Sequence, residues 1–137
     1  EKVDVRALDE KVGDWIWKQK SILNPPAIAI DGKTVRGSGD GEKKPIHLLS
    51  ALLHGQGTVI AQVAVGQKTN EIPCVVPLFE KLNIEGSVIT ADALLTQKEI
   101  GRHIVEDKKA DYVFTVKDNH PTLRQAIESL GDKAFSP

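Results

Sequence analysis

Two short apolar runs that each end in an aspartate constrain the fold of this chain more than any other feature. Ala27 to Ile30 leads into Asp31, and Val88 to Ala91 leads into Asp92. Short, uninterrupted apolar runs predict strands that are buried on both faces of a sheet. The backbone of such a strand is held rigidly by the sheet, and the aspartate that follows it is exposed where the sheet ends. If the two strands are neighbours, both carboxylates project from adjacent strand ends.

The composition is that of an ordinary globular domain. The 137 residues suffice for one domain with a core, and 40% of them are hydrophobic while 27% are charged. No stretch approaches the ~18 apolar residues of a membrane span, and residues 1–14 lack the apolar core of a signal peptide. The single cysteine, Cys74, excludes an intrachain disulfide and agrees with a reducing, cytoplasmic compartment.

The formal net charge of −1, from 18 basic and 19 acidic residues, gives little information about the partner. A dedicated nucleic-acid-binding domain usually carries a clear basic excess, which this chain lacks. An enzyme that acts on nucleic acid is still compatible with this charge, because a carboxylate metal site lowers the total.

Hydrophobic periodicity predicts one α/β core preceded by a helix. Helices are expected over residues 3–20, 70–82, 97–106 and 122–130, and strands over residues 27–31, 46–54, 58–65, 87–92 and 111–116. This order predicts a mixed five-stranded sheet, with an antiparallel meander on one side, parallel strands on the other, and flanking helices. Residues 1–25 are expected to form an N-terminal amphipathic helix and linker, and residues 26–137 the core.

The two strand-end acids are candidate metal ligands. Carboxylates from neighbouring strand ends can share a divalent ion that keeps open positions for phosphate and water. Either Asp31 or Asp92 taken alone is explained as well by a cap on the next turn or helix. The pair in this strand order favours the metal site.

Basic and amide side chains follow the same strands. Lys33 and Arg36 come directly after Asp31, and Lys117 and Asn119 follow the last strand. These donors suit contacts with a nucleic-acid backbone, although solvated turns explain them nearly as well.

Other polar residues carry weaker signals. No pair of histidines has zinc-site spacing, so His47 is expected to be an ordinary histidine. Glu71 begins a helix, where the helix dipole explains an acid.

Several blocks of the chain resemble one known family. Residues 28–38, Ile-Ala-Ile-Asp-Gly-Lys-Thr-Val-Arg-Gly-Ser, resemble the first-acid motif of insertion-sequence transposases of the ISAs type, also called H-repeat-associated proteins. Five further segments resemble later blocks of that family in the same order: residues 47–51, 68–72, 88–93, 110–114 and 117–120. The family more often has Gly and Gln where this chain has Asp118 and His120. The resemblance covers about residues 26–123.

This resemblance implies a bacterial DDE transposase with a ribonuclease H-like (RNase H-like) fold. Asp31 corresponds to the first acid and Asp92 to the second acid of a triad that binds Mg²⁺ or Mn²⁺. The implied activity is metal-dependent DNA phosphodiester hydrolysis and strand transfer during transposition of an insertion sequence. The implied partners are transposon-end and target DNA, with the parent protein a homo-oligomer on DNA in the nucleoid.

The third acid of the triad is missing from the matched blocks. The family carries it beyond the Lys-x-Asn block, in a His-Gly-Arg-x-Glu segment, and no such segment occurs before Pro137. Nothing around Glu128 matches that pattern. The chain is therefore expected to lack the C-terminal segment and to be inactive alone.

Two other interpretations remain open. The first is a catalytically inactive RNase H-like remnant that binds DNA or a partner. The second is a metal-dependent phosphatase with Asp31 as nucleophile. This one ranks last, because it expects a second aspartate where the chain has Lys33.

Overall fold

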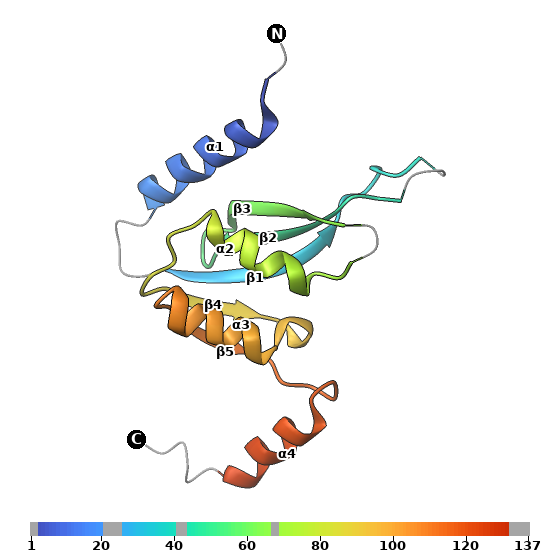
Figure 1. Ribbon diagram of the computed structural model, residues 1–137, viewed down its shortest axis with the longest axis vertical. Coiled ribbons are helices and arrows are strands. Elements are labelled where there is room, and N and C mark those ends of the chain that lie inside the picture. The colour runs from blue at the N-terminus through green and yellow to red at the C-terminus, as the bar shows by residue number, and fades with distance from the viewer. Residues whose placement is uncertain (1–2, 21–25, 41–43, 67–68, 132–137) are drawn as a thin grey trace.

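The computed structural model describes residues 3–20, 26–40, 44–66 and 69–131. Its sheet consists of β1 (Ala27–Thr34), β2 (His47–Leu53), β3 (Thr58–Val65), β4 (Val88–Ala91) and β5 (Asp111–Phe114). The α-helices are α1 (Val5–Lys20), α2 (Val75–Glu80), α3 (Lys98–Arg102) and α4 (Pro121–Leu130) (Figure 1). Short 3₁₀ turns are η1 (Ile72–Cys74) and η2 (Ala93–Leu95), and a π-helical segment, η3 (His103–Asp107), extends α3. The expected linker over residues 21–25 and the segment 132–137 lie outside the described residues.

The strand order confirms the mixed sheet that the sequence predicts. The five strands lie in the order β3-β2-β1-β4-β5. β1 pairs with β2, and β2 with β3, in antiparallel register, whereas β1 with β4 and β4 with β5 pair in parallel register. β1 is therefore the central strand at which the meander meets the parallel half.

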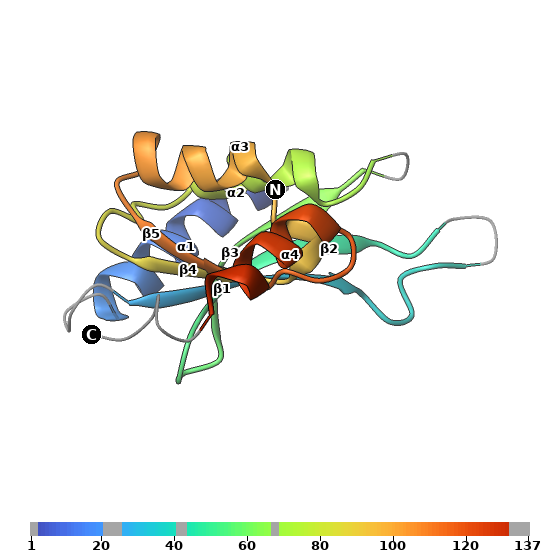
Figure 2. The ribbon, with the colours of Figure 1, turned by 90° about the horizontal axis from the view of Figure 1, so that it is seen from below.

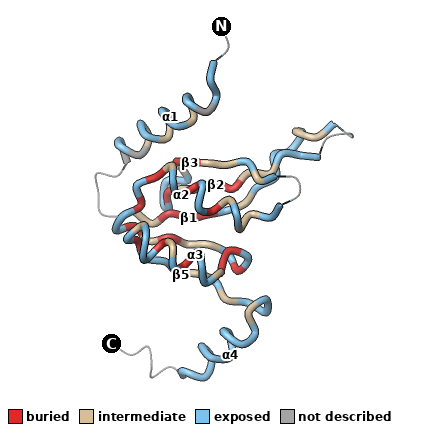
Figure 3. The backbone as a smooth tube through the Cα atoms, viewed as in Figure 1, coloured by how far each residue is buried: buried red, intermediate tan, exposed pale blue. Residues whose placement is uncertain are grey.

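The main core lies between one face of the sheet and the helices α2 and α3, which lie side by side over it (Figure 2). Residues from both layers are fully or almost fully buried, among them Ile28, Leu49, Ile89, Leu78, Phe79 and Ile104. Figure 3 shows that this burial is concentrated in the sheet and in these two helices. The buried hydrophobic residues of β1, β2, β3 and β4 thus explain why these strands pack under the two helices.

The expectation that β1 is buried on both faces is wrong. Ile28 and Ile30 are buried, while the alternating residues Ala27 and Ala29 are only half-buried. β1 also runs to Thr34, beyond the expected end at Asp31. β2 is long enough to pair with β1 as far as Thr34. The parallel pairing of β1 with β4, in contrast, stops at Ile30. Asp31 therefore ends the parallel pairing and not the strand itself.

The helices α1 and α4 lie beyond opposite edges of the sheet, α1 by β3 and α4 by β5 (Figure 1). α1 lies close to β3 at Gly13. A Cβ at this position would be only 2.8 Å from the carbonyl oxygen of Ile60. Lys81, which follows α2, adds a tie: its Nζ lies 2.8 Å from Asp9 Oδ2 on α1 and 2.9 Å from the Gln62 carbonyl oxygen on β3. Among the described residues, no helix is long and apolar enough to cross a membrane.

Two adjacent valines of α2 provide a direct test of this packing. Val75 is 1% exposed, whereas its neighbour Val76 is 43% exposed. We expect Val75→Ala to lower the free energy of unfolding by about 2 kcal/mol, because it removes buried methyl groups and leaves a cavity. The same substitution at Val76 should change it by less than about 0.5 kcal/mol. Urea unfolding of both variants measures the difference, and equal effects would contradict this packing of α2.

Candidate metal centre

The register of β1 and β4 brings the two candidate acids to one edge and one face of the sheet. The last parallel pair is Ile30 with Ala91, so that Asp31 and Asp92 are the next residues of neighbouring strands. Each acid also lies two residues beyond a paired residue, Ala29 in β1 and Thr90 in β4. Because side chains alternate between faces, both acids belong to the face opposite the α2–α3 core. Both are exposed.

Asp92 also caps the turn that follows β4. Its Oδ1 accepts hydrogen bonds from the backbone N–H groups of Leu94, at 3.0 Å, and Leu95, at 3.4 Å. Asp92 is therefore a capping residue, as one of the two sequence interpretations predicts, and it caps through only one of its two carboxylate oxygens. The cap also fixes the carboxylate at the sheet edge.

The segment after β5 lies against the same edge. Asn119 Nδ2 donates to the carbonyl oxygen of Ala93 at 2.7 Å and so ties the turn after Lys117 to η2. Three basic side chains are exposed: Lys33 near the C-terminal end of β1, Arg36 just after β1, and Lys117 after β5. The structure thus gives Asn119 a contact within the chain and leaves the three basic side chains open to solvent.

A polar network beside Asp31 was missed by the sequence analysis. His47 Nε2 lies 2.5 Å from Glu71 Oε1, and His47 Nδ1 lies 3.0 Å from Thr34 Oγ1. The Glu71 side chain is only 15% exposed. The sequence alone predicts that the helix dipole explains Glu71 and that His47 is an ordinary surface or interior histidine. No local pattern joins residues 34, 47 and 71, because the contact exists only once β2 pairs with β1 and the turn before α2 folds over them.

A third acid does not join Asp31 and Asp92 in the described part of the chain. There, no three His, Cys, Asp or Glu side chains cluster in a way that could hold a metal ion. Glu128, on the exposed α4, accepts a hydrogen bond from Arg124 Nε at 2.8 Å. The edge therefore offers two carboxylates.

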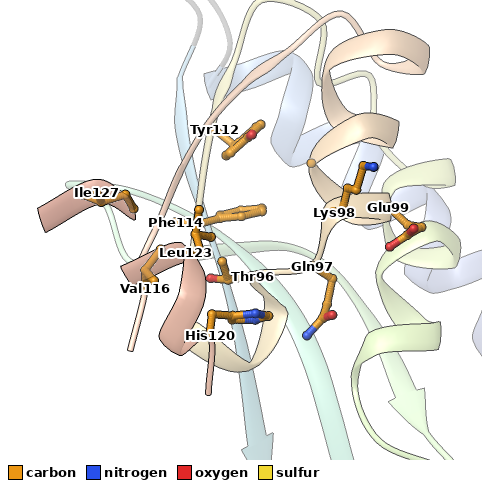
Figure 4. A pocket seen from close by; sticks show the side chains of 11 residues that line it. Thr96, Gln97, Lys98, Glu99, Tyr112, Phe114, Val116, His120, Leu123 and Ile127 are labelled. Atoms are coloured by element: carbon orange, nitrogen blue, oxygen red, sulfur yellow. The ribbon is translucent and has the colours of Figure 1, made fainter. Parts of the chain in front are cut away.

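A pocket of the described residues is separate from these acids. It has a volume of about 650 Å³ and lies between α3, β5 and α4 (Figure 4), where it is lined by Thr96, Gln97, Lys98, Glu99, Gly101, Tyr112, Phe114, Val116, His120, Leu123 and Ile127. Neither Asp31 nor Asp92 lines it. The pocket is therefore not the candidate metal centre.

Comparison with solved structures defines the class of fold. A piggyBac transposase, solved as a synaptic complex with hairpin DNA, superposes with a TM-score of 0.56 at 15% sequence identity. The match covers 93% of this chain and 33% of the piggyBac chain. Together with the strand order, it shows that the fold is RNase H-like.

The sequence comparisons identify the family. Residues 23–135 match the family described as "Transposase DDE domain". "Putative transposase YncI" of Escherichia coli K12 is 39% identical over 92% of this chain and 51% of its own length. "H repeat-associated putative transposase YhhI" of the same strain is 37% identical over 84% of this chain and 31% of its own length. The chain belongs to the DDE transposase family and spans about a third to a half of these relatives.

The cap at Asp92 yields a prediction that needs no metal. Asp92→Ala should lower the free energy of unfolding by about 1 kcal/mol, because two backbone N–H groups lose their acceptor. Asp92→Asn keeps a side-chain oxygen for these groups and should unfold almost as the wild type does. Urea unfolding in the presence of a chelator measures both. If the alanine variant is as stable as the asparagine variant, the cap contributes nothing.

Proposed function

We propose that the chain is part of a transposase that cleaves DNA phosphodiester bonds and joins the freed DNA end to a target. Asp31 and Asp92 are the first two acids of its metal site. The supporting observation is their position directly after the last residue pair of the parallel ladder, Ile30 with Ala91, and on one face of the sheet. The third acid comes from another part of the full-length protein, and the isolated chain is therefore inactive.

The two acids suit the metal that this family implies. Mg²⁺ and Mn²⁺ prefer hard oxygen ligands and are usually held by one or two carboxylates, with water and substrate phosphate filling the other positions. When bound, the ion supplies Lewis-acid polarisation of the scissile phosphate. Asp31 is exposed at the edge, and the cap holds Asp92 through Oδ1 alone in the described residues, so that Oδ2 is left as a ligand.

The reaction consists of two displacements at phosphorus. In the first, a water oxygen bonds to phosphorus and loses a proton to solvent, while the P–O bond to the 3′-oxygen breaks and that oxygen takes up a proton to become a 3′-hydroxyl. In the second, the oxygen of this 3′-hydroxyl bonds to a phosphorus of the target strand and its proton passes to solvent, while the P–O bond to the target's own 3′-oxygen breaks and that oxygen takes up a proton. Asp31 and Asp92 would hold the ion, which would polarise the reacting phosphate, and the paired strands β1 and β4 would keep the spacing of the two acids the same in both steps.

Basic side chains around this edge would position the DNA. We assign phosphate contacts to Lys33, Arg36 and Lys117, which are exposed around it. Asn119 would donate its second amide N–H to a DNA phosphate. Its first amide N–H bonds to the carbonyl oxygen of Ala93 and holds the turn in place. Such contacts orient a DNA backbone without reading its sequence. In the full-length protein, a homo-oligomer would bring transposon ends and target DNA together in the nucleoid.

One observation favours a second candidate function for the isolated chain. The absence of a three-ligand cluster among the described residues is also expected of a catalytically inactive remnant that keeps the fold and binds DNA or a partner. The two candidates differ in whether Asp31 and Asp92 bind a metal ion.

Metal titration separates them. Mn²⁺ binding, followed by calorimetry, should be clearly weaker in Asp31→Asn and in Asp92→Asn than in the wild type, because each variant replaces an anionic ligand with a neutral amide. Asp92→Asn keeps the cap, so that its loss of binding reports on ligation alone. If wild type and both variants bind Mn²⁺ equally, the shared metal site is wrong. Nicking of transposon-end DNA by the full-length parent, with and without the same substitutions, then tests catalysis.

Salt dependence of DNA binding tests the basic contacts. The double variant Lys33→Ala/Arg36→Ala should bind duplex DNA more weakly at every sequence, and its plot of log affinity against log salt should be shallower by about 0.9 for each lost phosphate contact. The matched control is Lys11→Ala/Lys18→Ala, which removes equal charge from exposed positions on α1. Equal slopes for the two double variants would mean that Lys33 and Arg36 make no specific phosphate contact.

A further inference from the structure

The carboxylate of Glu71 occupies the space in which a side chain at Gly32 would lie. A Cβ built on Gly32 would be 1.9 Å from Glu71 Oε1 and 2.7 Å from Glu71 Oε2. Real Cβ atoms do not approach other atoms so closely. Gly32 follows Asp31 directly, so that Glu71 contacts the backbone that carries the first acid.

Glu71 is itself held in place by β2. A carboxylate can only accept hydrogen bonds, and the His47 ring nitrogen Nε2 therefore donates to Oε1 at 2.5 Å. The other ring nitrogen, Nδ1, lies 3.0 Å from the Thr34 hydroxyl. Thr34 is in turn the residue of β1 that pairs with His47 across the antiparallel ladder. The network thus contacts β1 at two alternate residues, Gly32 and Thr34, just beyond Asp31.

We propose that Glu71, held by His47, is a positioning residue that fixes the end of β1 and thereby the direction of the Asp31 carboxylate. The proposal rests on the metal site described above and adds to it a part that the sequence motif does not assign. Beyond Ile30, β1 has no pairing with β4 and is bound on its β2 side only. The carboxylate of Glu71 supplies a contact from the face of the sheet at this point.

Glu71 acts through the backbone and is not a ligand of the same ion. Gly32 and Thr34 alternate with Asp31 along β1 and share the face of Ile28 and Ile30, on which α2 and α3 pack. Asp31 belongs to the opposite face. In agreement with this, Glu71 does not form a three-residue metal-binding cluster with Asp31 and Asp92 among the described residues.

Mn²⁺ titration of two Glu71 variants tests this role. Glu71→Ala removes the contact with Gly32 and should weaken Mn²⁺ binding about 10-fold or more, as loss of a group that orients a metal ligand typically does. Glu71→Gln keeps the size of the side chain and bonds to His47 in either ring tautomer, so that its affinity should stay within about threefold of the wild type. Glu85→Ala, the same change at an exposed residue before β4, is the matched control and should bind as the wild type does.

Three results would overturn the proposal. If Glu71→Gln loses as much affinity as Glu71→Ala, then the charge matters and Glu71 is a ligand. If Glu71→Ala binds Mn²⁺ normally while Asp31→Asn does not, the metal site stands and Glu71 does not position it. If Glu71→Ala and Glu85→Ala weaken binding equally, the effect is not specific to the contact.

A measurement without metal keeps this test separate from that of the metal site. Amide hydrogen exchange of the metal-free protein should quicken over residues 31–34 in Glu71→Ala, compared with residues 27–30 and with the wild type. Gly32→Ala, which displaces the Glu71 carboxylate without removing its charge, should quicken exchange over the same residues. Unchanged exchange in both variants excludes the positioning contact, whatever Asp31→Asn does to Mn²⁺ binding.

Discussion

The parallel pairing of β1 with β4 is the constraint on which the candidate site depends. Only four residue pairs form this ladder, from Ala27 with Val88 to Ile30 with Ala91. Side chains alternate along each strand, so that a shift of one residue in this register would move an acid to the opposite face. Burial of Ile28, Ile30 and Ile89 under α2 and α3 makes such a shift costly, since it would expose the isoleucines. The hydrophobic core thus sets the geometry of the two carboxylates.

The two acids are held in different ways. Asp92 is fixed locally, because its Oδ1 caps the turn that it begins. Asp31 is fixed by its strand, which continues past it in a ladder with β2. A structural role and a ligand role are therefore compatible at Asp92, and the cap restricts the carboxylate before any ion binds. A ligand restricted in this way loses less side-chain entropy on binding.

The sequence predicted the architecture well because the strong signals in this chain are local. The run of mostly apolar residues 58–65 and the helical spacing of residues 122–130 are each contained within one element, and the structure has both elements within a residue of the expected bounds. The split of the expected helix 70–82 into η1 and α2, and the extension of β1 to Thr34, depend on contacts with other elements. The same holds for the site. Asp31 and Asp92 stand out from their own strands, whereas the contact between His47 and Glu71 joins residues of different elements and has no local pattern.

The glycine after Asp31 illustrates how such a contact constrains a sequence. Asp-Gly is usually interpreted as a turn, in which glycine supplies a left-handed backbone. Gly32 instead lies within β1, paired with Leu49, and has no positive φ. Its role is to leave space, because the Glu71 carboxylate lies where a Cβ would be. Gly32 and Glu71 are therefore coupled, because a larger residue at position 32 would displace the Glu71 carboxylate from its contact with His47. The space beside Gly32 is thus occupied by an acid 39 positions further along the chain (71 − 32 = 39).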